Sequence, residues 1–580
     1  MSSPLLFQLL LLNGGGLGGV REHFLRGFLV SEFHQVYDPL GNVWLSALVA
    51  LLPILLFFLS LMVFKLKGYT AAFLSVALSA IIAVLVYKMP VSMVGSSFLY
   101  GFLYGLWPIA WIIIAAIFLY KLSVKSGYFE ILKESVQSIT LDHRILVILI
   151  GFCFGSFLEG AIGFGGPIAI TAAILVGLGL SPLYSAGLCL IANTAPVAFG
   201  AVGIPISAMA SAVGVPAILI SAMTGKILFF VSLFVPFFIV FLMDGFKGIK
   251  ETFPAVFIAA FSFAGAQFLS SNYLGPELPG IISALVSLVA TALFLKFWQP
   301  KAIFRSDGKA ASFTKSNHHI CKIYVAWSPF VILVLVIVLW IQPFFKALFE
   351  KDGLLAFSNF YFEFNNISNH IFKSPPFVEA NQSVSFPVVF KFFLINTVGT
   401  SIFLAALISM LVLRVRVSDA VSVFGETLKE MRYPILTIGL VLSFAYVSNY
   451  SGISSTLALA LTHTGLAFTL FSPLIGWVGV FLTGSDTSSN LLFGSLQQLT
   501  AQRLHLPEVL TLTANTVGGT LGKMISPQSI AIACAAVGLA GKESDLFKFT
   551  VKYSLIFVAI MGIVISAIAY LIPEVVPAIK

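Results

Sequence analysis

The sequence predicts an all-α polytopic membrane protein of about 12 to 14 transmembrane helices, arranged as two inverted repeats that each contain a re-entrant hairpin and a broken helix. The first observation is composition: 59% of the 580 residues are hydrophobic and 9% are charged, whereas soluble domains carry about 25% charged residues. Mean hydropathy is +1.03. The second observation is that two stretches rich in Gly, Asn, Thr and Pro resemble each other. The third is the distribution of Lys and Arg among the loops, which gives the two copies opposite orientations.

Apolar runs of about 20 residues, the length that crosses a bilayer, predict the individual spans. We expect helices throughout, because an open sheet would leave unpaired backbone groups in lipid. The long runs cover residues 43–64, 69–87, 97–120, 226–243, 254–272, 279–297, 324–342, 393–413, 466–483 and 547–572, and shorter or polar-interrupted segments fill 145–224, 433–464 and 486–542.

Four basic loops give a testable topology. They contain Lys65 and Lys67; Lys121, Lys125, Lys133 and Arg144; Lys301, Arg305, Lys309 and Lys315; and Arg414, Arg416, Lys429 and Arg432. We place all four in the cytoplasm, so that residues 88–96 and the polar stretch 343–390 lie outside. This scatter over short loops also explains the net charge of +9 better than a nucleic-acid partner does.

The repeat has a nearly constant spacing. Phe157 and Phe481 begin similar strings 324 residues apart, Asn193 and Asn515 are 322 apart, and Pro108 and Pro434 are 326 apart. The loop before Pro108 should be outside and the loop before Pro434 inside, so the copies are predicted to be inverted. In secondary transporters of this kind the site lies at the midplane between the repeats.

Four segments follow from this layout. Residues 1–36 are an N-terminal extension, because the Leu run there is too short to span and lacks the basic region of a signal peptide. The first transmembrane repeat is 37–248, linking helices and a basic loop occupy 249–322, and the second transmembrane repeat is 323–580, with its polar stretch at 343–390.

Each repeat contains a polar segment that an ordinary spanning helix would not tolerate. The run from Gly155 to Pro167 has many glycines and ends in proline, which cost about 1 and 3 kcal/mol respectively in a helix interior. Its counterpart, Thr483 to Asn490, holds hydroxyls and one carboxylate. We interpret both as tips of re-entrant hairpins.

Each repeat also contains a predicted broken helix, at Asn193, Thr194 and Pro196 and again at Asn515 and Thr516, followed by Gly522, Ser526 and Pro527. A break exposes half-helix N-termini that attract an anion. The Asn and Thr side chains either donate to a carboxylate or only cap the half-helices. The predicted substrate-binding residues are Asn193, Thr194, Ser485, Thr487, Ser488, Asn515, Thr516 and Lys523.

Three ionisable residues lie in these elements, and a charge at the bilayer centre costs on the order of 3 kcal/mol. Lys523 is the natural partner of a substrate carboxylate, or of Asp486 in an empty site. Glu159, in an apolar tip, and Asp486 are the predicted proton-coupling residues. The alternative is a structural ion pair among the three. No metal ligand set, nucleotide motif or catalytic triad is visible, so we predict neither an enzyme nor a cofactor.

The strings GFCFGSFLEGAIGFGGPIAITAAILVGLG from Gly151, AGLCLIANTAPVAFGAVGIPI from Ala186, VFLTGSDTSSN from Val480 and GKMISPQSIAIACAAVGLAGKESDLF from Gly522 strongly resemble the bacterial L-lactate permease family. The similarity runs from about Tyr37 to the last span. It implies a multi-pass protein of the bacterial cytoplasmic (inner) membrane that imports L-lactate, with D-lactate and glycolate, coupled to protons.

The layout is more distantly similar to that of divalent-anion/sodium symporters, whose Ser-Asn-Thr motifs bind carboxylate and sodium. Here the triplets read Ala-Asn-Thr, which argues against transferring a sodium site. We therefore expect lactate/proton symport by alternating access. The alternatives are a sodium-coupled or other carboxylate or dicarboxylate carrier, and a membrane subunit of a redox complex. The expected partners are a small monocarboxylate, a proton and the lipid bilayer, and oligomeric state is not predicted.

Overall fold

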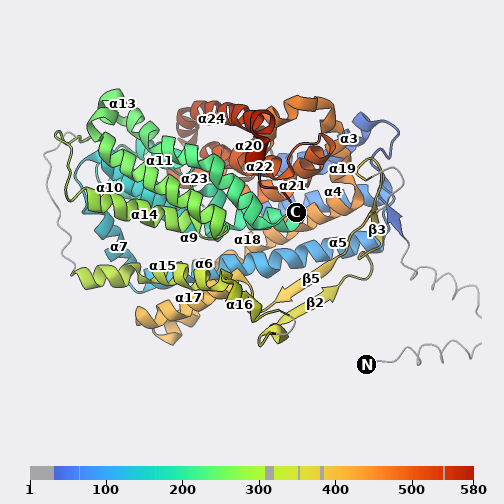
Figure 1. Ribbon diagram of the computed structural model, residues 1–580, viewed down its shortest axis with the longest axis horizontal. Coiled ribbons are helices and arrows are strands. Elements are labelled where there is room, and N and C mark those ends of the chain that lie inside the picture. The colour runs from blue at the N-terminus through green and yellow to red at the C-terminus, as the bar shows by residue number, and fades with distance from the viewer. Residues whose placement is uncertain are drawn as a thin grey trace, which may run out of the picture.

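The computed structural model describes residues 32–64, 66–163, 165–306, 319–350, 353–378, 384–539 and 542–579, and within these ranges the chain is a bundle of helices edged by short strands (Figure 1). The α-helices are α3 (Val43–Met62), α4 (Gly68–Leu85), α5 (Val91–Tyr104), α6 (Trp111–Lys125), α7 (Tyr128–Gln137), α8 (His143–Val147), α9 (Gly155–Ala161), α10 (Gly166–Gly177), α11 (Pro182–Ala192), α12 (Gly200–Val213), α13 (Ala217–Tyr273), α14 (Pro279–Phe294), α15 (Ile320–Ile341), α16 (Pro343–Ala347), α17 (Val398–Val412), α18 (Val417–Ser451), α19 (Ile453–Leu461), α20 (Phe468–Thr483), α21 (Asp486–Arg503), α22 (Glu508–Gly522), α23 (Pro527–Ala536) and α24 (Glu543–Leu571). The π-helical segments η1 (Gly105–Ala110) and η2 (Ile148–Phe154) join α5 to α6 and α8 to α9, and the 3-10 turns η3 (Val197–Phe199) and η6 (Lys523–Ile525) precede α12 and α23.

Membrane-spanning helices dominate the described part of the chain. Nine helices there are long and apolar enough to cross a bilayer, or up to ten if the bent pair α11–α12 is one span. The 57 residues of α13 have room for two passages at about 1.5 Å per residue, and Asp244 and Gly245 interrupt its helical backbone. The predicted runs 226–243 and 254–272 are therefore two arms of one kinked helix. The predicted all-α membrane class is confirmed.

The helix boundaries repeat along the chain. The first residues of α5 and α18, α8 and α20, α11 and α22, and α13 and α24 are 325 or 326 residues apart. The contacts are reciprocal as well: α10 packs against α23, and their counterparts α21 and α12 pack against each other. Two copies of one helical unit therefore interlock through their hairpins and the helices after their breaks.

Equivalent helices of the two copies run antiparallel at their crossing, where α5 and α18 lie side by side (Figure 1). A Cβ atom on Gly101 would lie 2.7 Å from Ser443 Cα, and one on Gly105 would lie 2.6 Å from Gly439 Cα. The residue numbers rise in α5 as they fall in α18, so the chains run in opposite directions, and glycine permits the close backbone approach. Inverted copies require this arrangement. The inversion of the complete repeats across the membrane stays a prediction.

Contacts between residues far apart in the sequence bring basic loops close together. Lys121 pairs with Glu430 at 2.6 Å, and Arg144 Nη2 donates to the carbonyl of Ala302 at 3.0 Å. These contacts join segments that the charge pattern assigns to the same side of the membrane. A contact also joins residues 88–96 to the polar stretch 343–390, because Asn366 Nδ2 donates to Ser96 Oγ at 3.3 Å, and their location outside the membrane stays a prediction.

The described residues of the polar stretch form the short helix α16 and small strands rather than membrane helices. In it, β2 (Asn359–Glu363) pairs antiparallel with β5 (Val389–Phe393), and β3 (Ile371–Lys373) pairs with β4 (Val384–Ser385). The strand β1 (Phe33–His34) pairs parallel with β3, which ties the end of the segment 1–36 to this stretch. Residues 1–31 of the predicted N-terminal extension lie outside the described residues.

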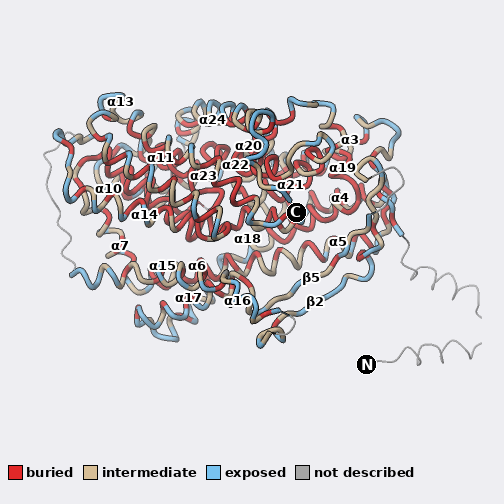
Figure 2. The backbone as a smooth tube through the Cα atoms, viewed as in Figure 1, coloured by how far each residue is buried: buried red, intermediate tan, exposed pale blue. Residues whose placement is uncertain are grey.

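Burial distinguishes the centre of the bundle from its rim. Figure 2 shows buried residues gathered in the central helices, including α11 and α22, while α13 and α24 expose their outer faces. The span His143–Ala161, which forms the first arm of the first hairpin, is entirely buried. Protein, rather than lipid, therefore surrounds this arm along its whole length.

Candidate functional site

Both predicted hairpins are present. In the first, α9 ends at Ala161 and α10 begins at Gly166, and the turn between them uses the positive φ of Gly163 (60°) and Gly165 (80°). In the second, Gly484 (φ 72°) ends α20. Ser485 then caps α21, its Oγ accepting from the backbone N–H of Ser488 at 3.2 Å. Each tip thus turns at glycine between two helical arms.

The two helix breaks differ. In the first copy α11 ends at Ala192, the chain bends by 67°, and Ala201 and Val202 have left-handed φ values of 44° and 57° before helical geometry resumes. In the second copy α22 continues through Asn515 to Gly522, and the break falls at residues 523–526.

The predicted break at Asn515 and Thr516 is therefore wrong in position. These two side chains hydrogen-bond within the helical bundle instead of capping a half-helix. Pro527 starts the next helix, since proline is compatible with the first helical turn but not with the helix interior.

A small cavity lies between the first hairpin, the second hairpin and both breaks. Its lining comes from both copies: Glu159, Gly163, Val197, Gly200, Ala201, Ile204, Pro205, Gly484, Ser485, Asp486, Thr487, Lys523 and Gln528. The Nζ atom of Lys523 lies 2.7 Å from Glu159 Oε1, and both side chains are more than 90% buried. This ion pair joins the first hairpin to the second break, so it crosses between the copies.

The cavity holds one more carboxyl group than this pair uses. Asp486 is 3% exposed, and neither of its oxygens has a hydrogen-bond partner among the described residues; the same holds for Glu159 Oε2. A glycine packs closely against each of these carboxyl groups. A Cβ atom on Gly519 would lie 2.1 Å from Asp486 Oδ1, and one on Gly200 would lie 2.9 Å from Glu159 Oε1.

Two helix N-termini reach the cavity, and one of them is the half-helix start that follows the predicted first break. One is the start of α21, where Ser485, Asp486 and Thr487 all line it. The other is the start of regular helix in α12 at Ile204, after the left-handed residues. Free backbone N–H groups and the helix dipole make such positions favourable for an anion.

Asn515 and Thr516 lie outside the cavity lining and hold Asn490. Asn490 Oδ1 accepts from Asn515 Nδ2 at 2.9 Å and from Thr516 Oγ1 at 3.3 Å. Asn490 Nδ2 donates to the carbonyl of Pro205, in the first break, at 3.1 Å. Our sequence reasoning named Asn490 only as the end of the polar run from Thr483 and gave it no role; the available signal was an amide directly after the hydroxyls of that run.

Asn193 and Thr194 also lie outside the lining. Thr194 Oγ1 donates to the carbonyl of Ile191 at 2.8 Å, and Asn193 Nδ2, which is buried, has no partner among the described residues. Ser488 is likewise absent from the lining. Of the predicted site residues, the cavity therefore brings together Glu159, Ser485, Asp486, Thr487 and Lys523.

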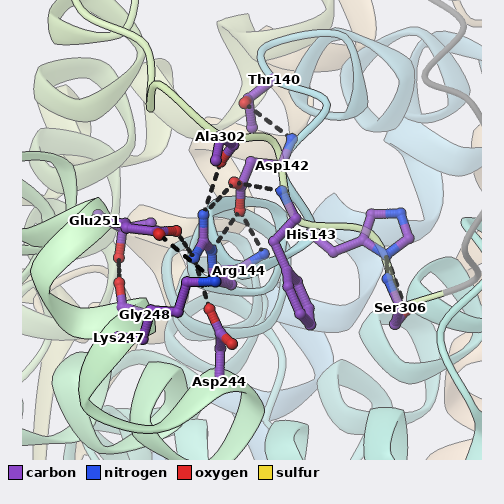
Figure 3. A network of polar contacts seen from close by, with 12 residues as sticks. Thr140, Asp142, His143, Arg144, Asp244, Lys247, Gly248, Glu251, Ala302 and Ser306 are labelled. Atoms are coloured by element: carbon purple, nitrogen blue, oxygen red, sulfur yellow. Dashed lines mark hydrogen bonds and ion pairs between the residues drawn. The ribbon is translucent and has the colours of Figure 1, made fainter.

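A second ionic cluster lies at the base of the first hairpin (Figure 3). Arg144, at the start of α8, is fully buried and forms ion pairs with Asp142 at 2.8 Å, Asp244 at 2.7 Å and Glu251 at 2.7 Å. Asp244 belongs to the kink of α13. The cluster thus fixes the base of the arm that carries Glu159 to α13.

Comparisons with known proteins give one consistent result. The family model for L-lactate permease matches residues 46–572. The L-lactate permease of Escherichia coli (strain K12) is 54% identical over 550 residues, covering 94% of this chain and 100% of that protein. The glycolate permease of the same strain is 52% identical, covering 92% and 98%, and the L-lactate permease of Bacillus subtilis (strain 168) is 49% identical with the same coverage.

Solved structures show a weaker likeness. The YdaH transporter of Alcanivorax borkumensis is 14% identical with a TM-score of 0.43, covering 83% of this chain and 89% of that one. The family model and the relatives span nearly the whole chain, with its transmembrane helices. The chain is a multi-pass protein of the cytoplasmic membrane and belongs to the L-lactate permease family, a family of transporters rather than enzymes.

Proposed function

We propose that this chain imports L-lactate and glycolate together with protons, by alternating access at the cavity between the hairpins. The names of the relatives support the substrate class, because lactate and glycolate are both small 2-hydroxymonocarboxylates. The observation that carries the mechanism is the buried Lys523–Glu159 pair, which joins the two copies inside that cavity.

Lys523 and the N-terminus of α21 form the proposed carboxylate site. An ammonium group and free backbone N–H groups both favour a carboxylate, and the hydroxyls of Ser485 and Thr487 add donors at the same place. Asn515 and Thr516 act through Asn490, which fixes α21 to the first break. Asn193, Thr194 and Ser488 belong to the surrounding framework in this proposal.

Substrate entry couples to a proton through Glu159. A lactate carboxylate that binds Lys523 takes the place of Glu159 Oε1. The displaced carboxylate would then be a buried charge without a partner, which costs several kcal/mol unless it takes up a proton. In the loaded carrier the lactate carboxylate balances Lys523 and the protonated Glu159 is neutral, and in the empty carrier the restored ion pair balances itself, so neither state has a net charge in the cavity from these groups. A half-loaded carrier has such a net charge, so it should not cross. Asp486 remains the second candidate for the proton.

Alternating access follows from inverted repeats. When two copies of opposite orientation differ in conformation, exchanging the two conformations moves the opening from one side of the membrane to the other. The breaks supply such a difference, since the first is long and strongly bent and the second is confined to residues 523–526.

Purified protein in liposomes tests the proposal directly. An inward L-lactate gradient should acidify the lumen without sodium, and glycolate and D-lactate should compete for uptake. Lactate uptake that requires sodium and leaves the lumen pH unchanged would favour a sodium-coupled carrier. Absence of uptake by the isolated protein would favour a subunit of a larger complex. Comparison with pyruvate and a dicarboxylate defines the substrate class.

A further inference from the structure

Asp486 is the polar group in the cavity whose role the ion pair leaves open. Its carboxyl group begins α21 and is buried, and both oxygens lack a partner among the described residues. Buried polar atoms in folded proteins are nearly always hydrogen-bonded, because an unpaired one loses its hydration without compensation. Two free acceptor atoms on one side chain that lines a cavity therefore indicate a donor that arrives with the ligand.

The surroundings hold this carboxyl group in place. Gly519 lies so close that a side chain there would overlap Asp486 Oδ1, so α22 forms a wall behind the carboxyl group. In front of it the cavity is shared with Lys523 and Thr487. A carboxyl group fixed in this way is pre-organised to read a donor on the ligand, since little side-chain freedom is lost on binding.

We infer that Asp486 determines specificity for 2-hydroxy acids by accepting the hydrogen bond of the substrate's hydroxyl group, while Lys523 binds the substrate's carboxylate. This inference rests on the proposed function. The two groups of a 2-hydroxy acid are separated by a single carbon atom, and Asp486 and Lys523 line one small cavity. An ionised carboxylate and a protonated carboxyl group both present an acceptor oxygen, so this role holds in either protonation state. It leaves Glu159 as the proton carrier.

An acid without the hydroxyl should bind poorly. Propionate retains the carboxylate of lactate but would leave both Asp486 oxygens unpaired, and sites built to bind a hydroxyl group reject analogues that lack it. Hydrogen bonds to charged groups correspond to about a 10- to 100-fold difference in affinity. We expect propionate and acetate to bind at least about tenfold more weakly than L-lactate and glycolate, respectively.

The wild-type protein provides the first test, by equilibrium binding in detergent, which requires no transport. L-Lactate, propionate and 2-methoxypropionate are titrated in turn. The methoxy compound has an oxygen atom at the position of the lactate hydroxyl, but this ether oxygen has no O–H to donate. It should therefore bind as weakly as propionate. If it binds as tightly as L-lactate, the hydroxyl is not a donor and the inference is overturned.

Variants locate the acceptor. In Asp486→Leu the preference for L-lactate over propionate should fall about tenfold or more, whereas Asp486→Asn, which keeps a carbonyl oxygen, should retain part of it. The matched control is Gln528→Leu, which removes another polar side chain from the same cavity and should leave the preference intact. A collapse in Gln528→Leu with full preference in Asp486→Leu would assign the hydroxyl to Gln528. If Asp486→Leu does not fold, Asp486→Asn and the methoxy titration still test whether Asp486 accepts the hydrogen bond of the substrate's hydroxyl group.

The two proposals fail differently. If wild-type protein neither binds nor transports lactate, the proposed function is wrong. If it does both, but Asp486→Leu still discriminates between lactate and propionate as the wild type does, the proposed function stands and the inference about Asp486 is wrong.

Discussion

The bases of the two hairpins occupy equivalent positions in the repeats but use different chemistry. In the first copy, Arg144 is the second residue of α8 and pairs with Asp244 of α13 at 2.7 Å. In the second copy, Thr469 is the second residue of α20, and its hydroxyl lies 2.9 Å from Ser566 Oγ and 3.5 Å from Tyr570 Oη, both on α24. Arg144 and Thr469 are 325 residues apart, and Asp244 and Tyr570 are 326 apart. One anchor is therefore a buried ionic cluster and its counterpart is a set of neutral hydroxyls.

This difference continues to the hairpin tips. The ionically anchored arm carries Glu159, and it is held at both ends by ion pairs, to Asp244 at the base and to Lys523 at the tip. The second tip carries Asp486, which has no partner among the described residues. The comparison teaches that the repeat supplies the framework and that charged substitutions within it give the copies different roles. In the proposed mechanism the first hairpin serves proton coupling, and the second serves substrate contact.

The largest effect is expected at Lys523. Lys523→Ala should reduce lactate uptake to background, because the carboxylate site is lost and Glu159 is left as a buried unpaired charge, at a cost of about 3–5 kcal/mol. Radiolabelled lactate uptake into vesicles, normalised to the amount of inserted protein, measures the effect. The control is Lys226→Ala, a half-buried lysine of α13 that lies outside the cavity lining and donates to the carbonyl of Val575 at 2.7 Å, which should transport normally.

The double variant Glu159→Gln/Lys523→Gln separates stability from transport. It should recover most of the lost thermal stability, since no buried charge is left unpaired, but it should not recover uptake. Normal uptake in Lys523→Ala would show that Lys523 is not part of the substrate site. The proposed difference in role between the two hairpin tips would then be unsupported.

The next effect is expected at the hairpin bases. Arg144→Gln leaves three carboxylates without their buried partner and should lower the free energy of unfolding by about 3–5 kcal/mol. The equivalent change, Thr469→Val, removes neutral hydrogen bonds worth about 1 kcal/mol. Thermal unfolding of the two purified variants in one detergent compares them. Equal losses would contradict the view that the first hairpin is the more firmly anchored one.

A smaller effect is expected at the glycines behind the two carboxyl groups. The added methyl of Gly519→Ala would lie 2.1 Å from Asp486 Oδ1 and 2.8 Å from Val480 Cγ2, whereas that of Gly200→Ala would lie 2.9 Å from Glu159 Oε1. Overpacking of this kind costs about 1–3 kcal/mol, and Gly519→Ala should be the more damaging of the two. Lactate binding and thermal unfolding of both variants check the order. The reverse order would mean that Asp486 moves more freely than Glu159.

Much of this architecture was predictable because lipid imposes strong rules on sequence. Long apolar runs predicted the spans, and glycine and polar residues within apolar sequence predicted both hairpins. The position of the second break was not predictable from Asn515, because a side chain that satisfies its hydrogen bonds inside a bundle has the same sequence signature as one that caps a broken helix. The Arg144 cluster was missed for a related reason: basic residues near span ends normally indicate topology, and the partners Asp244 and Glu251 are about 100 residues away.

The smallest effect is expected at Lys121, which pairs with Glu430 across the antiparallel helices α6 and α18. Because Glu430 is 56% exposed, water and salt screen this pair, and Lys121→Gln should cost less than about 1 kcal/mol. The Lys121 variant is informative in comparison with Arg144. Both residues are basic and join distant segments, but Arg144 is fully buried. If α6 and α18 form a static interface, the rate of lactate uptake in Lys121→Gln should equal that of the wild type at low and high salt. A change in rate without a change in thermal stability would show that these two helices move against each other during transport, and the boundary between fixed and moving parts would then lie within the α6–α18 contact rather than at the hairpins.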